Sequence, residues 1–294
     1  MAYEIVEYVW LDNDSNLRSK SRTLGSSYLL DVNLQDYLYR DLNKEKADQN
    51  ISLKMQWSYD GSSTGQAPGN NSEVIIRPVY IIKNSYYNQK YSENNYYIAM
   101  CQTFSHDFEP LDNNNYFKLT KYMHRDAEKN PYFGFEQEFF LMQVNQYNYS
   151  QEMNIPVGYN SSETNGQDTQ QYYCANGASN VFERELVNLV YYHGLKSGLL
   201  LSGTNAEVAI GQWEIQVGPV AGIEACHQLW LLRFLLVRIA EEHNMNVSYH
   251  PKPLENWNGS GLHTNFSNNT MRRVMDNKEE QNKVYQYIIK YIES

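Results

Sequence analysis

The pattern of apolar and polar residues differs between two parts of the chain. The first part is rich in strand-like runs, and the second contains both helical and strand-like runs. The first part has β-favouring runs at 3–11, 17–24 and 74–82, where aromatic and β-branched residues recur. Between them, the Gly-, Ser- and Thr-rich run 60–69 predicts a loop. The polar segment 33–50 is expected to be a surface insertion with a short helix.

The second part follows a polar linker at 107–115, which contains Pro110 and three consecutive asparagines. Helices are expected over 116–129, 179–195, 222–244 and 282–293, and strands over 132–142, 205–216 and 261–267. Ser179 is the expected N-cap of its helix. The pattern therefore predicts an α+β protein with two domains, at 1–109 and 115–294.

Side chains alternate between the two faces of a strand, and in 132–142 this alternation pairs two carboxylates. Glu136 and Glu138 share one face. The opposite face carries Phe133, Phe135, Phe139 and Leu141, with Gln137 as its one polar residue. The strand would thus present two acidic groups from an aromatic-backed support.

Two further strands present a ligand group in the same way. Glu214 lies on the polar face of 212–217, and His263 begins the polar face of 263–267. Buried like charges repel unless a cation neutralises them. Carboxylates with one imidazole suit Mg²⁺ or Mn²⁺ better than zinc. The alternative is that these are ordinary solvent-facing residues, because the alternation alone does not bring the three strands together.

Composition limits the functional classes. The 294-residue chain carries a net charge of −10, which argues against binding nucleic acid or an anionic membrane. Its three cysteines are far apart, and its N-terminus lacks a targeting pattern, so a reducing, cytoplasmic location is expected.

Common catalytic and nucleotide motifs do not explain the chain. The run 61–65 fits the G-x-S-x-G pattern of serine hydrolases, but Pro68 and the residues after it break the helix which that motif requires. Neither a Walker A nor a G-x-G-x-x-G motif occurs. A bound nucleotide would therefore need another architecture.

Five longer motifs follow one another along the chain: WSYDGSST (57–64), FGFEQE (133–138), GTNAE (203–207), QWEIQVGP (212–219) and NWNGSGLHTNFS (256–267). In this order they resemble the motifs of eukaryotic-type glutamine synthetases, over nearly the whole chain. The resemblance implies an N-terminal β-grasp domain and a catalytic α/β domain. It also implies that glutamine is made from glutamate, ammonium and ATP through γ-glutamyl phosphate.

The resemblance also implies roles for individual residues. Mg²⁺ or Mn²⁺ would be held by Glu136 and His263 at one position and by Glu138, Glu207 and Glu214 at the other. Glutamate would be bound by Asn256, Trp257, Asn258 and Gly259. ATP would be contacted by Tyr132, Glu136, Glu214, Pro219, Asn265, Ser267 and Arg272. Asp60 would reach into a neighbouring subunit to bind and deprotonate ammonium, which implies a ring-shaped homo-oligomer.

The family's chains continue beyond the position of Ser294, into a segment with a further metal-ligating glutamate and phosphate-binding arginines. We therefore expect either a fragment of a longer protein or a naturally short relative. The second possibility gives an alternative function, a non-catalytic subunit that co-assembles with complete subunits or senses glutamine. A ligase for another amine is a third option, but the Asp60 carboxylate favours a small cation such as ammonium.

Overall fold

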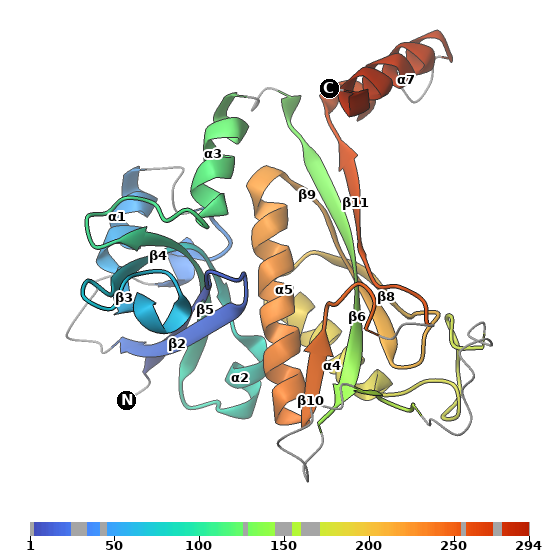
Figure 1. The fold of residues 1–294 in the computed structure, drawn as a ribbon, viewed down its shortest axis with the longest axis horizontal. Helices are drawn as coiled ribbons and strands as arrows, with labels where there is room; N and C mark the ends of the chain where they lie inside the picture. The colour runs from blue at the N-terminus through green and yellow to red at the C-terminus, as the bar shows by residue number, and fades with distance from the viewer. Residues whose placement is uncertain are drawn as a thin grey trace.

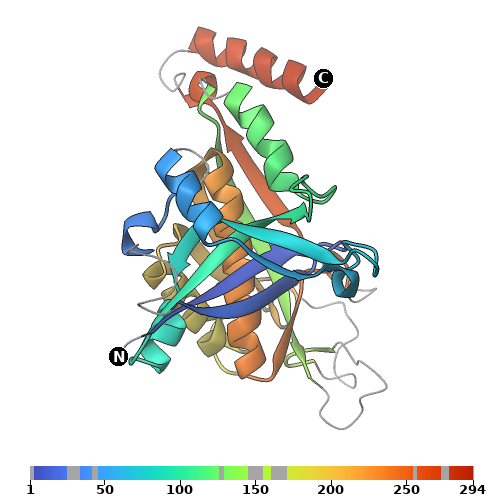
Figure 2. The same ribbon diagram turned by 90° about the vertical axis from the view of Figure 1, so that its left-hand side faces the viewer.

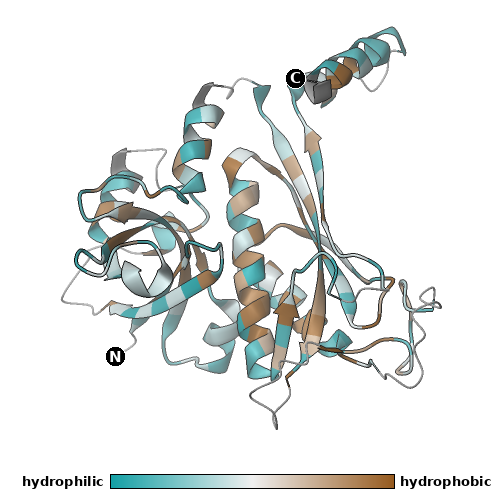
Figure 3. Ribbon diagram, viewed as in Figure 1, coloured by the Kyte–Doolittle hydropathy of each residue, from teal (hydrophilic) through white to brown (hydrophobic). Residues whose placement is uncertain are grey.

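Two β-sheets enclose a long central helix. The computed structural model describes residues 3–24, 34–41, 46–125, 129–144, 155–159, 171–253, 257–272 and 278–293. Helix α5 (Gly222–Glu242) lies between the sheets (Figure 1), and the strands of the first sheet run across it in the perpendicular view (Figure 2). In hydropathy colouring α5 is largely apolar (Figure 3), as expected for a helix covered on two sides.

The first sheet contains five strands in the order β2-β1-β5-β4-β3. These are β1 (Glu4–Leu11), β2 (Leu17–Leu24), β3 (Trp57–Asp60), β4 (Glu73–Lys83) and β5 (Asn95–Ser105). β1 and β5 are parallel, and the other pairs are antiparallel. The strands expected over 3–11, 17–24 and 74–82 are confirmed as β1, β2 and β4, whereas β3 and β5 were not predicted from the sequence. The β-grasp assignment stays a prediction.

The second sheet contains six strands. These are β6 (Tyr132–Gln143), β7 (Ile155–Pro156), β8 (Leu201–Ala206), β9 (Gln212–Ala221), β10 (Met245–Ser248) and β11 (Leu262–Ser267). β9 pairs with one edge of β6, whereas β10 and β11 pair with different halves of β6. This pairing makes β6 the centre of the second sheet.

One apolar cluster joins the two sheets through α5. It includes Val9 and Ile98 of the first sheet, Phe139 and Ile215 of the second, and Leu231 of α5. The predicted domain boundary, between β5 and the helix that follows it, therefore does not interrupt the core. The aromatic-backed face of β6, expected from the alternation, is the face that packs here.

The polar residue on that apolar face has a partner. Arg233 of α5 donates from Nε to Oε1 of Gln137 at 2.7 Å. The Gln137 amide in turn donates to the backbone oxygen of Glu138 at 2.7 Å. The guanidinium also stacks on Trp230, 4.7 Å from the ring centroid. Gln137 thus ties β6 to α5, because a buried amide needs hydrogen bonds to offset its desolvation.

The opposite face of the first sheet has its own core, which corrects the expectation of a surface insertion. A 3₁₀ turn (Leu34–Tyr37) and helix α1 (Lys46–Lys54) lie over this face. Leu34, Leu38 and Ile51 are buried in a second apolar cluster there. The polar composition concealed Leu34 and Leu38, two isolated apolar anchors within the predicted insertion, and Ile51 lies one residue beyond its end.

The remaining helices are α2 (Ser85–Lys90), α3 (Asn115–Arg125), α4 (Arg184–Lys196), α6 (Asn269–Arg272) and α7 (Lys278–Glu293). The expected start of α4 at Ser179 is wrong. A turn closes from Asn180 N to Gly177 O, and Glu183 has a positive φ of 57°, so the helix begins at Arg184. Within the described residues, no helix has the length and apolarity needed to cross a bilayer.

Truncating the buried side chain of Leu231, in the central helix α5, should destabilise the whole fold. Leu231 is 0% exposed, so Leu231→Ala should lower the free energy of unfolding by about 3 kcal/mol through lost burial and a cavity. Leu200→Ala is the matched control, because Leu200 is 55% exposed. Urea denaturation measures both variants. An equal, small effect at the two positions would contradict the placement of α5.

Candidate functional site

Strand register brings the predicted acidic residues together on one face of the second sheet. His263 of β11 lies opposite Glu136 of β6, and Glu138 of β6 lies opposite Glu214 of β9. Directly opposed residues on one sheet face are close enough for their side chains to interact. The three strands therefore meet, which the alternation alone left open.

The side chains form two adjoining groups that could each hold a metal ion. In the first, one ligand atom from each of Glu136, Glu214 and His263 lies within 4.8 Å of the others. In the second, the same holds for Glu138, Glu207 and Glu214. Glu214 belongs to both groups. We refer to the five residues together as the acidic cluster.

Burial and mutual repulsion define the electrostatics of the second group. Glu214 is 5% exposed and Glu207 is 9% exposed. Burial raises the pKa of Glu138, and the charges of Glu214 and Glu136 raise it further. Burial likewise raises the pKa of Glu207, with contributions from Glu138 and Glu214. In the described part of the chain, no lysine or arginine forms an ion pair with these carboxylates. A bound divalent cation fits this donor set.

Glu136 differs from its neighbours because two side chains stabilise its charge. Asn265 Nδ2 donates to Glu136 Oε1 at 2.8 Å, and His263 Nδ1 lies 3.1 Å from Oε2. These contacts, the Asn265 hydrogen bond first, lower the pKa of Glu136. The same pairing raises the pKa of His263. The neutral imidazole needed for metal binding is therefore reached more readily at higher pH.

A side-chain amide orients Glu138. Gln212 Nε2 donates to Glu138 Oε2 at 3.3 Å, and Gly261 N donates to the same oxygen at 2.8 Å. Gln212 also donates to Gly259 O at 2.9 Å. Among the described residues both hydrogen bonds to the Glu138 side chain end on Oε2, so the carboxylate is held through one oxygen.

Two further amides orient the other buried carboxylates. Gln216 Nε2 donates to Glu214 Oε1 at 2.8 Å, and Asn205 Nδ2 donates to Glu207 Oε1 at 2.8 Å. A Cβ on Gly203 would lie 2.7 Å from Gln216 Oε1, so glycine there leaves room for this amide. Gln212 and Gln216 were not among the predicted site residues. Their shared strand face with Glu214 was the available signal.

Glu136 and Glu214, both expected to contact ATP, belong to the cluster itself, and the other expected ATP contacts lie beside it, where β6 begins and β11 ends. Ser267 pairs with Tyr132 across these strands. Arg272 Nη1 donates to Ser267 Oγ at 3.0 Å, and its guanidinium lies 4.5 Å from the Tyr132 ring centroid. Pro219 and Asn265 both lie next to Gly134. A Cβ added to Gly134 would lie 4.0 Å from Pro219 Cα and 3.7 Å from Asn265 Cβ. Asn265 also donates a hydrogen bond to Glu136, so the expected ATP contacts adjoin the acidic cluster.

The residues expected to bind glutamate adjoin the cluster through Gln212. Gly259 accepts its hydrogen bond, and Gly259 and Asn258 are exposed. Trp257 is instead buried, with its ring 5.5 Å from that of Tyr159. Asn256 lies outside the described residues.

Asp60 lies on the first sheet, and α5 separates that sheet from β11 (Figure 1). Its carboxylate is fully exposed and accepts hydrogen bonds from Ser62 N at 3.0 Å and Ser62 Oγ at 2.6 Å. These bonds lower its pKa. Gly61 is needed in this turn, because a Cβ would lie 2.3 Å from Val74 Cγ2. The structure does not bring Asp60 to the acidic cluster of its own chain.

Known proteins match the chain along most of its length. The family model for the glutamine synthetase catalytic domain matches residues 115–292. The chain is 39% identical over 273 residues to a glutamine synthetase of Neurospora crassa, 41% over 271 to one of Colletotrichum gloeosporioides, and 39% over 273 to a glutamine synthetase cytosolic isozyme of Daucus carota. The matches cover 92%, 91% and 91% of this chain but 66%, 65% and 68% of these relatives. The chain thus spans about two thirds of their length.

Removing one charge from the cluster should stabilise the metal-free protein. The raised pKa of Glu138 means that its ionised form is disfavoured by folding, so the free energy of unfolding falls as pH rises from 4.5 through the raised value. Glu138→Gln keeps an oxygen for Gln212 and Gly261. In EDTA, its melting temperature should exceed that of the wild type by an amount that grows toward pH 7. Mn²⁺ should raise the melting temperature of the wild type more than that of the variant.

Glu109→Gln serves as the control for this measurement, because Glu109 is exposed and lies outside the cluster. It should melt like the wild type with and without Mn²⁺. A Glu138→Gln protein that is less stable than the wild type at pH 7 in EDTA would contradict the repulsion.

Proposed function

The chain belongs to the glutamine synthetase family, and we propose from this premise that it is an ATP-dependent glutamate–ammonia ligase. The proposal rests above all on one observation: two sets of possible metal-binding side chains lie side by side and share Glu214. Beside them, Arg272 supplies a cation and Tyr132 an aromatic ring. We propose a cytoplasmic location for the reaction, as the sequence predicts.

Each group of the cluster would hold one Mg²⁺ or Mn²⁺ ion. Glu136 and His263 would be ligands on the nucleotide side, because Asn265, which donates to Glu136, shares its face of β11 with Ser267, the residue that accepts from Arg272. Glu138, Glu207 and Glu214 would be ligands on the glutamate side, because Gln212 links Glu138 to Gly259. Bound ions supply positive charge that offsets the charge developing on phosphate oxygens during transfer.

The chain's own residues would position the reactants. Arg272 and Tyr132 would bind ATP, the first by charge and the second by stacking. Asn258 and Gly259 would orient glutamate so that its γ-carboxylate attacks the terminal phosphorus of ATP, releasing ADP and forming γ-glutamyl phosphate. Ammonia would then attack the acyl carbon and release phosphate. Catalysis of such a transfer depends mainly on positioning and charge stabilisation.

Asp60 would serve the site of a neighbouring subunit in a ring-shaped homo-oligomer. Its carboxylate is fully exposed on the sheet that α5 separates from the cluster. A carboxylate with a lowered pKa remains charged at neutral pH and suits the ammonium cation. Asp60 would deprotonate this ion to ammonia.

Phosphate release from ATP tests the function directly. The full natural gene product should release phosphate with Mg²⁺ or Mn²⁺ only when glutamate and ammonium are both present. Glu136→Gln should reduce the rate by at least about 100-fold, as loss of a charge-stabilising group does, and should abolish metal-dependent ATP binding. Release without any dependence on glutamate would refute the ligase. Binding of Mn²⁺ and ATP without turnover would favour the non-catalytic alternative.

Subunit mixing tests the shared site. Asp60→Asn and Glu136→Gln should each be inactive alone, because every site would lack one essential group. When the two variants are co-assembled, sites that combine an intact Asp60 with an intact Glu136 should recover part of the activity. Ser62→Ala is the control, since it removes a hydrogen bond of Asp60 but keeps its carboxylate. Absence of recovery in a verified mixed oligomer would place Asp60 outside the neighbour's site.

A further inference from the structure

One side-chain amide, that of Gln212, joins three separate segments of the candidate site. Gln212 is the first residue of β9 and is 2% exposed. Its Nε2 donates to Glu138 Oε2 at 3.3 Å and to Gly259 O at 2.9 Å, while its Oε1 accepts from Ala209 N at 3.1 Å. Because both ends of the amide have partners, its orientation is fixed.

The backbone of Gln212 also holds the turn that carries Glu207. Glu207 N donates to Gln212 O at 2.9 Å, and Gln212 N donates to Ala209 O at 3.1 Å. Two of the three residues of the second group, Glu138 and Glu207, therefore hydrogen-bond to this one residue. Such outer partners fix the direction of a metal ligand, so a cation that draws in either residue also displaces Gln212.

Glu138 and Gln212 contact different residues of the segment 257–261. Glu138 N donates to Gly261 O at 3.1 Å, and Gly261 N donates to Glu138 Oε2 at 2.8 Å. Gln212 instead bonds Gly259, which is one of the residues expected to bind glutamate. The Gln212 amide is therefore a direct link between the metal-binding carboxylates and the expected glutamate site.

We propose that Gln212 is a positioning residue through which a metal ion at Glu138 and Glu207 orders residues 257–261, so that metal binding strengthens glutamate binding. The inference deepens the proposed function and rests on it, because the glutamate site is part of that function. A carboxylate has about four acceptor positions, so the two hydrogen bonds to Glu138 Oε2 leave room for a cation. Coupling between two ligands is reciprocal, so glutamate should strengthen metal binding by the same factor.

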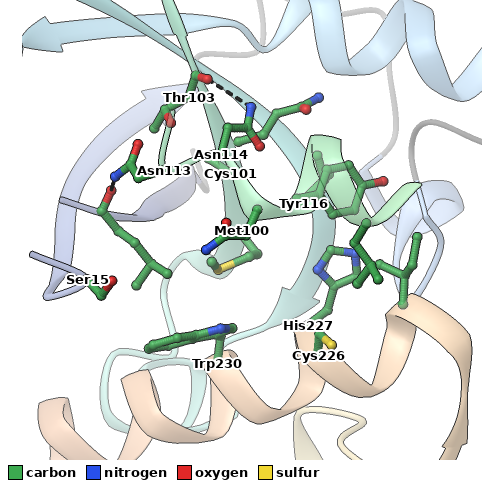
Figure 4. A pocket seen from close by; sticks show the side chains of 16 residues that line it. Ser15, Met100, Cys101, Thr103, Asn113, Asn114, Tyr116, Cys226, His227 and Trp230 are labelled. Carbon is green, nitrogen blue, oxygen red and sulfur yellow. Dashed lines mark hydrogen bonds between the residues drawn. The ribbon is translucent and has the colours of Figure 1, made fainter. Parts of the chain in front are cut away.

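A separate pocket, between α5 and the first sheet, provides an internal reference. In Figure 4, Asn114 and Tyr116 line one side of this pocket, and Trp230 of α5 lines another. Its described lining includes no residue of the acidic cluster and no hydrogen-bond partner of Gln212. Residues 113–116 should therefore not respond to events at Gln212.

Hydrogen exchange followed by mass spectrometry tests the coupling without turnover. Saturating Mg²⁺, with no glutamate or ATP present, should slow amide exchange over 257–261 in the wild type and leave 113–116 unchanged. Gln212→Met removes the donor at a similar side-chain length, so the slowing over 257–261 should fall about tenfold, the effect of losing two hydrogen bonds. Isothermal titration calorimetry should show the same loss in the factor by which Mg²⁺ strengthens glutamate binding.

Two controls separate coupling from general damage to the site. Gln216→Met removes an amide that bonds Glu214 rather than 257–261, so it should weaken Mg²⁺ binding but keep the slowing once Mg²⁺ is saturating. Ser260→Ala changes the segment itself. Ser260 Oγ is buried with no hydrogen-bond partner among the described residues, so this variant should behave like the wild type.

Gln212→Glu is a second test, which applies also if Gln212→Met fails to fold. It keeps the size and the acceptor for Ala209 N, but at neutral pH its carboxylate offers no hydrogen to Gly259 O. The added oxygen ligand and charge should maintain or strengthen Mg²⁺ binding while the slowing over 257–261 falls. A purely structural role would not move these two measurements in different directions.

Failure of the coupling and failure of the proposed function give different results. A wild type that binds neither Mg²⁺ nor glutamate would refute the proposed function and the coupling with it. A wild type that binds both, together with undiminished slowing over 257–261 in Gln212→Met or Gln212→Glu, would overturn the coupling alone. Equal slowing over 113–116 and 257–261 in the wild type would also overturn it, because the metal would then stabilise the fold in general.

Discussion

Repulsion among carboxylates on one face of a β-sheet is the constraint on which this structure depends. Two strands, β6 and β9, carry Glu136, Glu138 and Glu214 to the same place, and Glu207 joins them from the end of a third, β8. Burial makes their ionised forms costly. The fold offsets this cost with amide hydrogen bonds, a histidine pairing and a donor set suited to divalent cations, while the opposite face of β6 is fixed to α5 through Gln137 and Arg233.

Much of this site was predictable because a strand has a simple period. Alternation alone paired Glu136 with Glu138 and placed Glu214 and His263 on polar faces. The predicted aromatic face of β6 is confirmed, because it packs in the apolar core. Glu207 follows the last residue of β8, so no alternation places it, and it came only from the family resemblance. Strand partners depend on tertiary pairing, and a single sequence does not encode register in a readable pattern.

Two features explain the errors in the predicted fold: the local backbone conformation before α4, and isolated apolar residues within a polar segment. Ser179 is a suitable N-cap residue, but the turn at Gly177 and the positive φ of Glu183 delay the helix to Arg184. Leu34 and Leu38 were hidden in a polar segment because burial there is set by the sheet beneath them.

Manganese titration followed by electron paramagnetic resonance tests the central claim most directly. Two Mn²⁺ ions should bind per chain, close enough for their spins to couple, because Glu214 belongs to both groups. Glu214→Gln should weaken both sites together, while Glu138→Gln should weaken mainly one. Binding of no Mn²⁺ by the folded protein, or loss of only one ion in Glu214→Gln with the other unaffected, would contradict the account.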